Sequence, residues 1–363
     1  MKIDEIRATA YRIPTAEPES DGTLTWTATT AVVVEVSAAG QTGLGYTYGS
    51  AACADLVRQE LAPVVAGESP LDVPRLARDM AIAVRNVGRG GPTAMAISAV
   101  DTALWDLKAR LLDVPLAALF GQVHDGVAVY GSGGFTSLTD DELVGQLGSW
   151  VHRDGIPRVK IKIGTAWGSR ADRDLDRVAL ARRTIGDDAE LYVDANGAYT
   201  AKQAVRLAAQ FEELGVTWFE EPVSSDDLAG LHSVKEATEI DVAAGEYGHD
   251  TWYFERMCAA DAVDCLQADV TRCGGFTGWL AAATVAAAHG LELSAHCAPA
   301  LHAHVAGAVA NVRHIEYFAD HIRVERLLFA GVTEPVDGVL RPDLSSIGSG
   351  LELRRADADR WRC

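Results

Sequence analysis

Two patterns of apolar and polar residues divide the chain. The first segment alternates them, as in KIDEIRATAYRIP and TAVVVEVSAAGQTGLGYTYG, with the turn signal AAGQTG between apolar runs. This alternation predicts an antiparallel meander. From residue 51 to about residue 119 the spacing becomes helical, so a small α+β domain is expected first. The segment AMAISAVDTALWDLKARLL places four apolar residues on one helix face: Ile97, Val100, Leu104 and Leu107.

From Val127 onward, short apolar runs alternate with helical stretches such as LDRVALARRTIG. The apolar runs are VAVYGSG, RVKIKIG, LYVDANG, VTWFEEP, DVAAGEY, VDCLQAD, LELSAHC and VRHIEYF. Strand–helix alternation that reaches eight strands predicts a parallel barrel. We therefore expect an α+β cap over residues 1–125, a barrel over residues 126–329, and an irregular tail over residues 330–363 that packs on the cap.

Ionisable residues stand at the ends of the predicted barrel strands. From the second strand to the eighth, these ends carry Lys160 and Lys162, Asp194, Glu220, Glu246, Asp269, His296 and Glu316. They follow one another at intervals of about one strand–helix unit, and the active sites of parallel barrels lie at the C-terminal strand ends. Ionisable residues that recur at the same position of each strand–helix unit are not expected if they are only randomly placed surface charges. The pattern therefore predicts an active site at this rim.

Side-chain alternation directs both lysines of VKIKI into the barrel. Lys160 and Lys162 share one face of the strand, and the apolar residues share the face that should meet the helices. In YVDAN the same period places Asp194 and Asn196 on one face. Lysine has an ordinary pKa of ~10.4. We expect Lys160 and a nearby metal ion to lower the pKa of Lys162 and make it a usable base.

Three carboxylates end consecutive strands and can converge. Asp194, Glu220 and Glu246 would repel one another strongly without a cation, and no basic residue interleaves with these three ends in the sequence. All-oxygen ligation favours Mg²⁺ before Mn²⁺ or Ca²⁺, and disfavours Zn²⁺. Glu221 has the opposite strand phase and is expected to be a supporting acid rather than a ligand. An ion-pair network with Arg or Lys is the alternative for this triad.

An acid–base pair is predicted on the next two strands. Asp269 and His296 end neighbouring strands, which lie about 5 Å apart. A carboxylate orients a histidine and raises its basicity. Lys162 approaches the barrel mouth from a different side than His296. A substrate held on the metal would then lie between two proton-transfer groups.

These residues resemble the enolase superfamily and, within it, the mandelate racemase-like subgroup. The resemblance spans essentially the whole chain and is carried by KIK, VDANGAY, FEEP, AAGE, QAD, SAH, HIEYF and the cap helix AISAVDTALWDLKARL. It implies a capping domain, a (β/α)7β barrel, a tail that returns to the cap, and one Mg²⁺ per subunit.

The resemblance also implies a mechanism. A substrate carboxylate would bind Mg²⁺ and Lys160, and a base would remove the α-proton to make an enediolate. In a dehydration, Lys162 would take this proton and His296 would protonate the departing β-hydroxyl. In a racemisation the same two residues would exchange roles. Glu316, if protonated, would donate a hydrogen bond to the carboxylate; a purely structural role is its alternative.

The resemblance favours an acid-sugar dehydratase, because members of the family with this lysine and His–Asp pair mostly have that activity, and it therefore implies a sugar acid as substrate. The segment TAEPESDGTLTW predicts a polar, mobile loop of the cap, and its acids and threonine suit a hydroxylated substrate. Trp26 is a candidate for substrate contact or for the cap core. Arg272 is a candidate for a distal substrate carboxylate or for capping a helix at the surface. Asn196 is a further candidate contact.

Composition narrows the partners. The 363 residues include 51 acids and 32 bases, a formal net charge of −19. This excess of acids argues against nucleic acid or an anionic membrane. No signal peptide or membrane span is recognised, and the six cysteines form no CxxC pair. We therefore expect a cytoplasmic enzyme with reduced thiols that forms a homo-oligomer and acts on a small carboxylate.

Three other functions fit the sequence less well. A muconate-type cycloisomerase would carry a further lysine near the sixth strand, where DVTRCGG supplies only Arg272. A non-catalytic, sugar-acid-binding regulator would lack at least one proton-transfer residue. A metal-dependent barrel hydrolase would show histidines at the third to fifth strand ends, and none is there.

Overall fold

The computed structural model describes residues 1–363 and begins with an antiparallel sheet in the order β1-β2-β3. Its strands are β1 (Glu5–Ser20), β2 (Thr25–Ala38) and β3 (Gln41–Tyr48). The helices that follow are α1 (Ala52–Leu56), α2 (Ala62–Val65), α3 (Val73–Ala83), α4 (Pro92–Leu111) and α5 (Leu116–Phe120), of which α1 and α4 pack on the sheet. The predicted meander and the apolar helix face are present, since Ile97, Val100, Leu104 and Leu107 of α4 are all buried.

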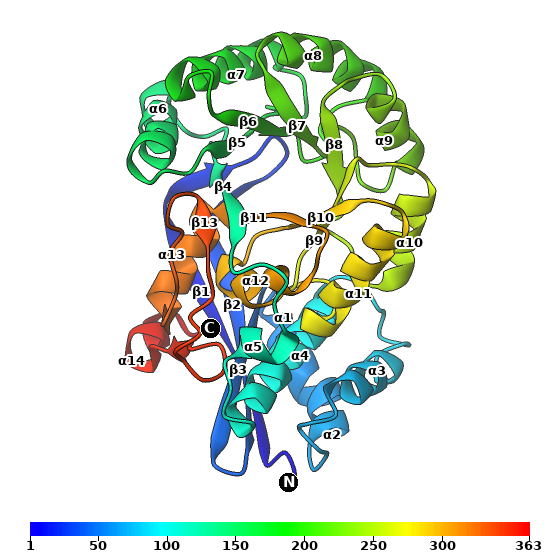
Figure 1. The fold of residues 1–363 in the computed structure, drawn as a ribbon, viewed down its shortest axis with the longest axis vertical. Helices are drawn as coiled ribbons and strands as arrows, with labels where there is room; N and C mark the ends of the chain where they lie inside the picture. Colours follow the sequence, from blue (N-terminus) through cyan, green and yellow to red (C-terminus); the bar gives the residue numbers. More distant parts are fainter.

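Eight parallel strands follow and close on themselves, because β11 pairs with β4. They are β4 (Val127–Gly133), β5 (Arg158–Lys162), β6 (Glu190–Asp194), β7 (Val216–Glu220), β8 (Asp241–Ala244), β9 (Cys265–Ala268), β10 (Glu292–Ala295) and β11 (Val312–Phe318). Each of the eight apolar runs forms one strand, so the predicted barrel is confirmed. In Figure 1 the barrel occupies the upper part of the molecule and the cap the lower part.

Helices alternate with the barrel strands and cover them from outside (Figure 1). They are α6 (Asp140–Gly148), α7 (Ala171–Ile185), α8 (Ala201–Glu213), α9 (Leu228–Lys235), α10 (Thr251–Ala259), α11 (Gly275–Ala288) and α12 (Pro299–Val305), and α13 (Ala319–Leu328) follows the last strand. Thr139 and Glu142 form a capping box that starts α6. Inside the barrel, a separate apolar cluster forms a floor: Tyr130, Tyr192, Trp218, Ala243 and Cys265.

The segment expected to be a mobile loop is instead the tip of a β-ribbon. Strands β1 and β2 continue through it after a register shift between Pro14 and Glu19, and Asp21 caps the turn by accepting from the backbone of Leu24. The bulge accommodates the prolines that had indicated a loop. The tip also bonds to the barrel, since the Trp167 amide donates to the Gly22 carbonyl over 2.9 Å. Figure 1 shows this blue hairpin reaching up to the barrel.

The tail contains short elements that contact both the barrel and the cap. They are β12 (Phe329–Ala330), β13 (Val339–Leu340), β14 (Glu352–Leu353) and α14 (Arg355–Ala358). Strand β13 pairs with β4 of the barrel. Arg355 forms an ion pair with Glu35 of β2, and the Ser349 amide donates to Asp106 of α4 over 2.6 Å. The tail therefore links the cap to the barrel.

No disulfide is present: five of the cysteines are buried as free thiols, and Cys363 is exposed. None of the helices has the length and hydropathy that crossing a membrane requires.

Candidate active site

Strand register places three charged residues in one row. Lys162 of β5 pairs with Asp194 of β6, and Asp194 pairs with Glu220 of β7. Because in-register neighbours on parallel strands point to the same side of the sheet, all three side chains enter the barrel mouth. They are buried, above the aromatic floor, and the indole of Trp218 donates to Glu220 over 2.9 Å. The strand pattern thus carries these groups into one small volume.

Asp194, Glu220 and Glu246 converge. Each offers one carboxylate oxygen, and these oxygens all lie within 4.8 Å of one another. Oε2 of Glu246 and Oε1 of Glu221 are buried without a hydrogen-bond partner. Six buried acids surround the mouth, against Lys160, Lys162, Arg272 and His296: they are Asp194, Glu220, Glu221, Glu246, Asp269 and Glu316. An excess of buried negative charge and all-oxygen donors fit a hard divalent cation such as Mg²⁺.

Basic residues contact the three carboxylates in space, although none stands between them in the order of strand ends along the sequence. Lys160 contacts Glu220, Lys162 contacts Asp194, and Arg272 lies 3.1 Å from Glu246. These partners come from strands that are far apart in the chain but adjacent in the barrel, so the sequence order concealed them. Arg272 is therefore neither a surface residue nor a helix cap. Its guanidinium also lies 5.2 Å from the ring centroid of Tyr247.

The protein groups around Lys162 on their own raise its pKa, whereas the expected lowering also includes the charge of a bound metal ion. Burial disfavours its ammonium, and the charge of Lys160 acts in the same direction. The carboxylates of Asp194, Glu220 and Glu316 together outweigh both and raise the pKa of Lys162 above its ordinary value. The negative charge next to Lys162 thus decides its protonation.

The predicted His–Asp pair is formed. Nδ1 of His296 lies 2.8 Å from Asp269, whose other oxygen accepts from the amide and hydroxyl of Thr271 at 2.7 Å. Burial alone would raise the pKa of Asp269, but the hydrogen bond from His296 and its positive charge lower it to about 2. Nε2 of His296 faces the carboxylates and lies 3.2 Å from Glu246.

Glu316 accepts hydrogen bonds and donates none. It lies 2.8 Å from the ammonium of Lys160 and accepts from Ser132 at 2.6 Å and from the Cys297 amide at 3.0 Å. Burial favours its neutral form, but Lys160 and His296 lower the pKa of Glu316 below its usual range. The protonated Glu316 considered from the sequence is thus not the form that this environment stabilises.

Two candidate substrate contacts lie at the edge of this cluster. Strand β6 ends at Asp194, so the two-residue alternation does not extend to Asn196, whose φ of 45° is left-handed. The backbone amide of Asn196 donates to Asp194 over 2.8 Å, and its buried side-chain Oδ1 has no hydrogen-bond partner. Trp26 of the hairpin packs edge-to-face on Phe135 at 5.6 Å and donates to Glu19.

Two residues in contact with the cluster were absent from the sequence-based set. Ser132 pairs in register with Lys160 and hydrogen-bonds Glu316, and its strand is the one barrel strand without an ionisable end. Ser132 would have been found by including the inward-facing residue at the end of every barrel strand, whether or not that residue is ionisable. Cys297 directly follows His296 and lies 3.3 Å from its Nε2, although the sequence indicated only a free thiol.

Two family models cover most of the chain. Residues 5–121 match the mandelate racemase / muconate lactonizing enzyme N-terminal domain, and residues 142–358 match the enolase C-terminal domain-like model. A crystal structure of a mandelate racemase/muconate lactonizing enzyme-like protein from Rubrobacter xylanophilus superposes with a TM-score of 0.96. It is 48% identical, and all of both chains is covered.

Two enzymes of known activity are also similar. The 3,6-anhydro-alpha-L-galactonate cycloisomerase of Streptomyces coelicolor is 33% identical over 97% of this chain and 98% of its own. The L-talarate/galactarate dehydratase of Salmonella typhimurium is 30% identical over 87% of this chain and 81% of its own. The structure of the dehydratase with Mg and L-lyxarohydroxamate superposes with a TM-score of 0.91 at 28% identity, covering 100% of this chain and 93% of that one.

Proposed function

Because this chain belongs to the mandelate racemase / muconate lactonizing enzyme family of the enolase superfamily, we propose that it is a Mg²⁺-dependent sugar-acid dehydratase. It removes the proton alpha to a carboxylate and then eliminates a β-hydroxyl as water, which leaves a 2-keto-3-deoxy sugar acid. The observation that carries this proposal is a three-carboxylate cation site with Lys162 against one carboxylate and a His296–Asp269 pair against another.

In this proposal Asp194, Glu220 and Glu246 hold one Mg²⁺. When bound, the ion neutralises the substrate carboxylate as negative charge develops on it. Lys160 is too enclosed to reach a proton on the substrate's carbon chain, because its side chain is fully buried between Glu220 and Glu316. It therefore binds the substrate carboxylate and does not act as the base.

Lys162 takes the α-proton, and His296 delivers a proton to the departing hydroxyl from the other side. Asp269 holds the ring of His296 with Nε2 directed into the mouth. The carboxylates around Lys162 keep it protonated, and a cation held by Asp194 and Glu220 would offset their charge and so favour the neutral amine that a base requires. Phe135 and Phe318 form an apolar cluster with Cys297, and Trp26 packs against it. In this proposal the cluster keeps water away from His296, the neighbour of Cys297.

The test is proton NMR of the Mg²⁺-loaded protein in D₂O against aldonic and aldaric acids. We expect a 2-keto-3-deoxy product from at least one acid, and no product after chelation with EDTA. A matched pair of variants identifies the ion site: Glu246→Gln should require a higher Mg²⁺ concentration, whereas Glu213→Gln, at the exposed end of α8, should not. Silence across the whole set would reject the sugar-acid dehydratase.

Two isomerase activities are the alternatives. The same Lys162 and His296 could exchange the α-proton on opposite faces of a 2-hydroxy acid, as a racemase or epimerase. A cycloisomerase is favoured by one specific observation, the likeness to the Streptomyces coelicolor enzyme along 97% of this chain. A 3,6-anhydro-galactonate in the same NMR set separates these outcomes. Its ring opening without loss of water would indicate cycloisomerisation, and loss of the α-proton signal alone would indicate racemisation.

A further inference from the structure

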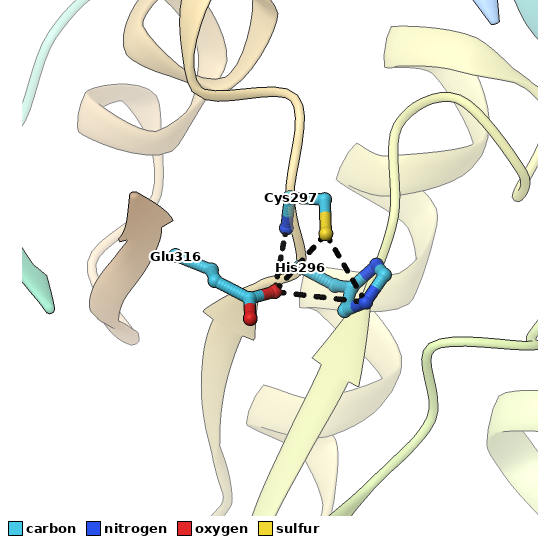
Figure 2. A group of neighbouring side chains, drawn as sticks. All are labelled: His296, Cys297 and Glu316. Carbon is cyan, nitrogen blue, oxygen red and sulfur yellow. Dashed lines mark hydrogen bonds and ion pairs between the residues drawn. The ribbon is translucent and has the colours of Figure 1, made fainter. Parts of the chain in front are cut away.

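A thiol, an imidazole and a carboxylate meet beside the proposed Mg²⁺ site. Sγ of Cys297 lies 3.3 Å from Nε2 of His296 and 3.3 Å from Oε2 of Glu316. The nitrogen and the oxygen are 3.6 Å apart. Figure 2 shows the three side chains facing one another, with the sulfur, the nitrogen and the oxygen at the corners of a small triangle. All three residues are buried, and the proposed reaction has no use for the thiol.

This triangle is close in size to one face of a zinc coordination tetrahedron. With Zn–S of about 2.3 Å and Zn–N and Zn–O of about 2.0–2.1 Å, tetrahedral angles place the sulfur about 3.6 Å from the nitrogen and the oxygen, and place these two about 3.3 Å apart. In the structure both sulfur separations are 3.3 Å and the nitrogen–oxygen separation is 3.6 Å, so each side of the triangle changes by about 0.3 Å when an ion binds. A mixed sulfur, nitrogen and oxygen set is also what Zn²⁺ prefers, whereas Mg²⁺ prefers oxygen alone.

The surrounding groups orient these donors as the outer ligands of a metal site do. Asp269 engages Nδ1 of His296 at 2.8 Å, which directs Nε2 into the triangle, where it offers a lone pair once its proton has left. The Cys297 amide donates to Oε2 of Glu316 over 3.0 Å and fixes the carboxylate. Cys297 itself has a φ of 52°, in the left-handed region that cysteine rarely adopts. This backbone conformation is held by the fold and directs the thiol to the triangle.

We propose that Cys297, His296 and Glu316 form a second metal site, which takes a thiophilic divalent ion such as Zn²⁺ and is distinct from the all-oxygen site. Binding releases the thiol proton of Cys297 and the Nε2 proton of His296 to solvent, and leaves a thiolate and a neutral imidazole as ligands of the ion. Glu246, 3.2 Å from Nε2, adds negative charge nearby. Because the ion occupies Nε2 of His296, zinc and turnover exclude each other. The site is therefore inhibitory.

Co²⁺ is the spectroscopic probe for this site. We expect CoCl₂, added to protein saturated with Mg²⁺, to produce a thiolate-to-cobalt charge-transfer band in the near ultraviolet, and ZnCl₂ to abolish it. Cys297→Ser should remove the band and weaken Zn²⁺ binding at least about tenfold in calorimetry, since a hydroxyl is a poor ligand for a soft ion. Cys363→Ser, which removes the one exposed thiol, should retain both signals.

Absence of the band from the unmodified protein would overturn the proposal, as would a band that survives in Cys297→Ser or disappears in Cys363→Ser. Circular dichroism verifies that the serine variant folds. If it does not fold, His296→Asn keeps the thiol and should weaken Co²⁺ binding by a similar factor; unchanged Co²⁺ affinity would reject the triangle. None of these measurements uses a substrate, so their outcome is independent of the dehydratase proposal.

Discussion

At the scale of single residues, the two lysines of β5 differ in what can reach them. The side chain of Lys160 is 0% exposed and that of Lys162 is 8% exposed. Lys160 is enclosed by two carboxylates and lies 5.2 Å from the ring centroid of Tyr130, whereas Lys162 lies near the ring of Phe318. One strand thus presents a more enclosed lysine, whose charge the carboxylates favour and which suits a substrate carboxylate, and a more exposed lysine that suits proton transfer.

This difference predicts a separation of two steps by mutation. Lys162→Met should slow exchange of the substrate α-proton with D₂O by about 10²–10⁴-fold, the usual contribution of a general base. His296→Asn should keep that exchange but lose the dehydrated product by a similar factor, because only the departing hydroxyl lacks its proton donor. Proton NMR of the substrate measures both. Lys235→Met, on the outer helix α9, is the control, and equal loss of exchange in both site variants would contradict the assignment.

The sequence predicted the phases of these residues but not their partners. Alternation in VKIKI was sufficient to turn Lys160 and Lys162 inward, because the two-residue period of a strand is local. The partner of Lys160, Glu220, is 60 residues away, and only the strand pairing brings the two together. Asn196 and Glu221 were harder still, since both have left-handed backbones just beyond a strand end, with φ of 45° and 38°. No periodicity describes such positions.

At the scale of elements, the β1–β2 hairpin and helix α13 join the cap to the barrel mouth. The sequence predicts a mobile loop at this hairpin because prolines and glycine are turn signals. The hydrogen bond that holds the hairpin tip comes from the barrel, which the local sequence does not reveal. Helix α13 contacts strand β3 of the cap, where the hydroxyl of Tyr46 donates to Glu325 of α13 over 2.6 Å. Both elements therefore depend on contacts between segments far apart in the chain.

Gly22 at the hairpin tip allows the closest of these contacts. A Cβ atom there would lie 2.4 Å from the Ile163 carbonyl oxygen and 2.5 Å from that of Gly164. Gly22→Ala should therefore lift the tip and speed proteolysis between residues 15 and 26 at least about tenfold, because overpacking typically costs about 1–3 kcal/mol. Gly145→Ala is the control, since its Cβ meets nothing within 4 Å. Equal proteolysis rates in the two variants would mean that the tip is not held by the barrel.

Glu325 predicts a pH dependence of stability. Burial raises its pKa to about 8, although the hydrogen bond from Tyr46 acts in the opposite direction. The folded protein thus holds the proton more tightly than the unfolded chain, whose pKa is ~4.3. The free energy of unfolding should fall as the pH rises from ~4.3 towards 8, by at most ~1.4 kcal/mol per pH unit from this group.

Glu325→Gln removes the ionisation, so the stability difference between the natural protein and this variant should decrease with pH across that window. Denaturant unfolding at several pH values measures it, with Glu352→Gln at an exposed position as the control. A difference that is independent of pH would show that Glu325 does not titrate in this range.

At the scale of the whole molecule, the cap is completed by the tail. Asp106 of α4 is buried and accepts from the Leu44 amide at 2.8 Å, from the Ser349 amide at 2.6 Å and from Arg110 at 2.8 Å. These partners come from β3, from the tail and from α4 itself. One carboxylate therefore holds three segments together.

Asp106→Leu should destabilise the protein by about 3–5 kcal/mol, because it leaves Nε of Arg110 and two buried amides without an acceptor. The loss should appear in denaturant unfolding and as faster proteolysis of residues 330–363. Asp113→Asn, at an exposed left-handed position that asparagine tolerates, is the control. A cost below about 1 kcal/mol would mean that the tail is held mainly by its other contacts.

The bond between Asp106 and Ser349 also sets an order of events during translation. Helix α4 leaves the ribosome early, but the amide that completes its buried carboxylate is made 243 residues later. Domains generally fold as their segments emerge. While the ribosome synthesises the barrel, Asp106 therefore lacks one of its hydrogen-bond donors. The cap reaches its final stability only after the barrel and the tail have been made. A nascent chain whose synthesis stops within the barrel lacks the contact between Asp106 and Ser349, and its cap is then open to local unfolding and proteolysis.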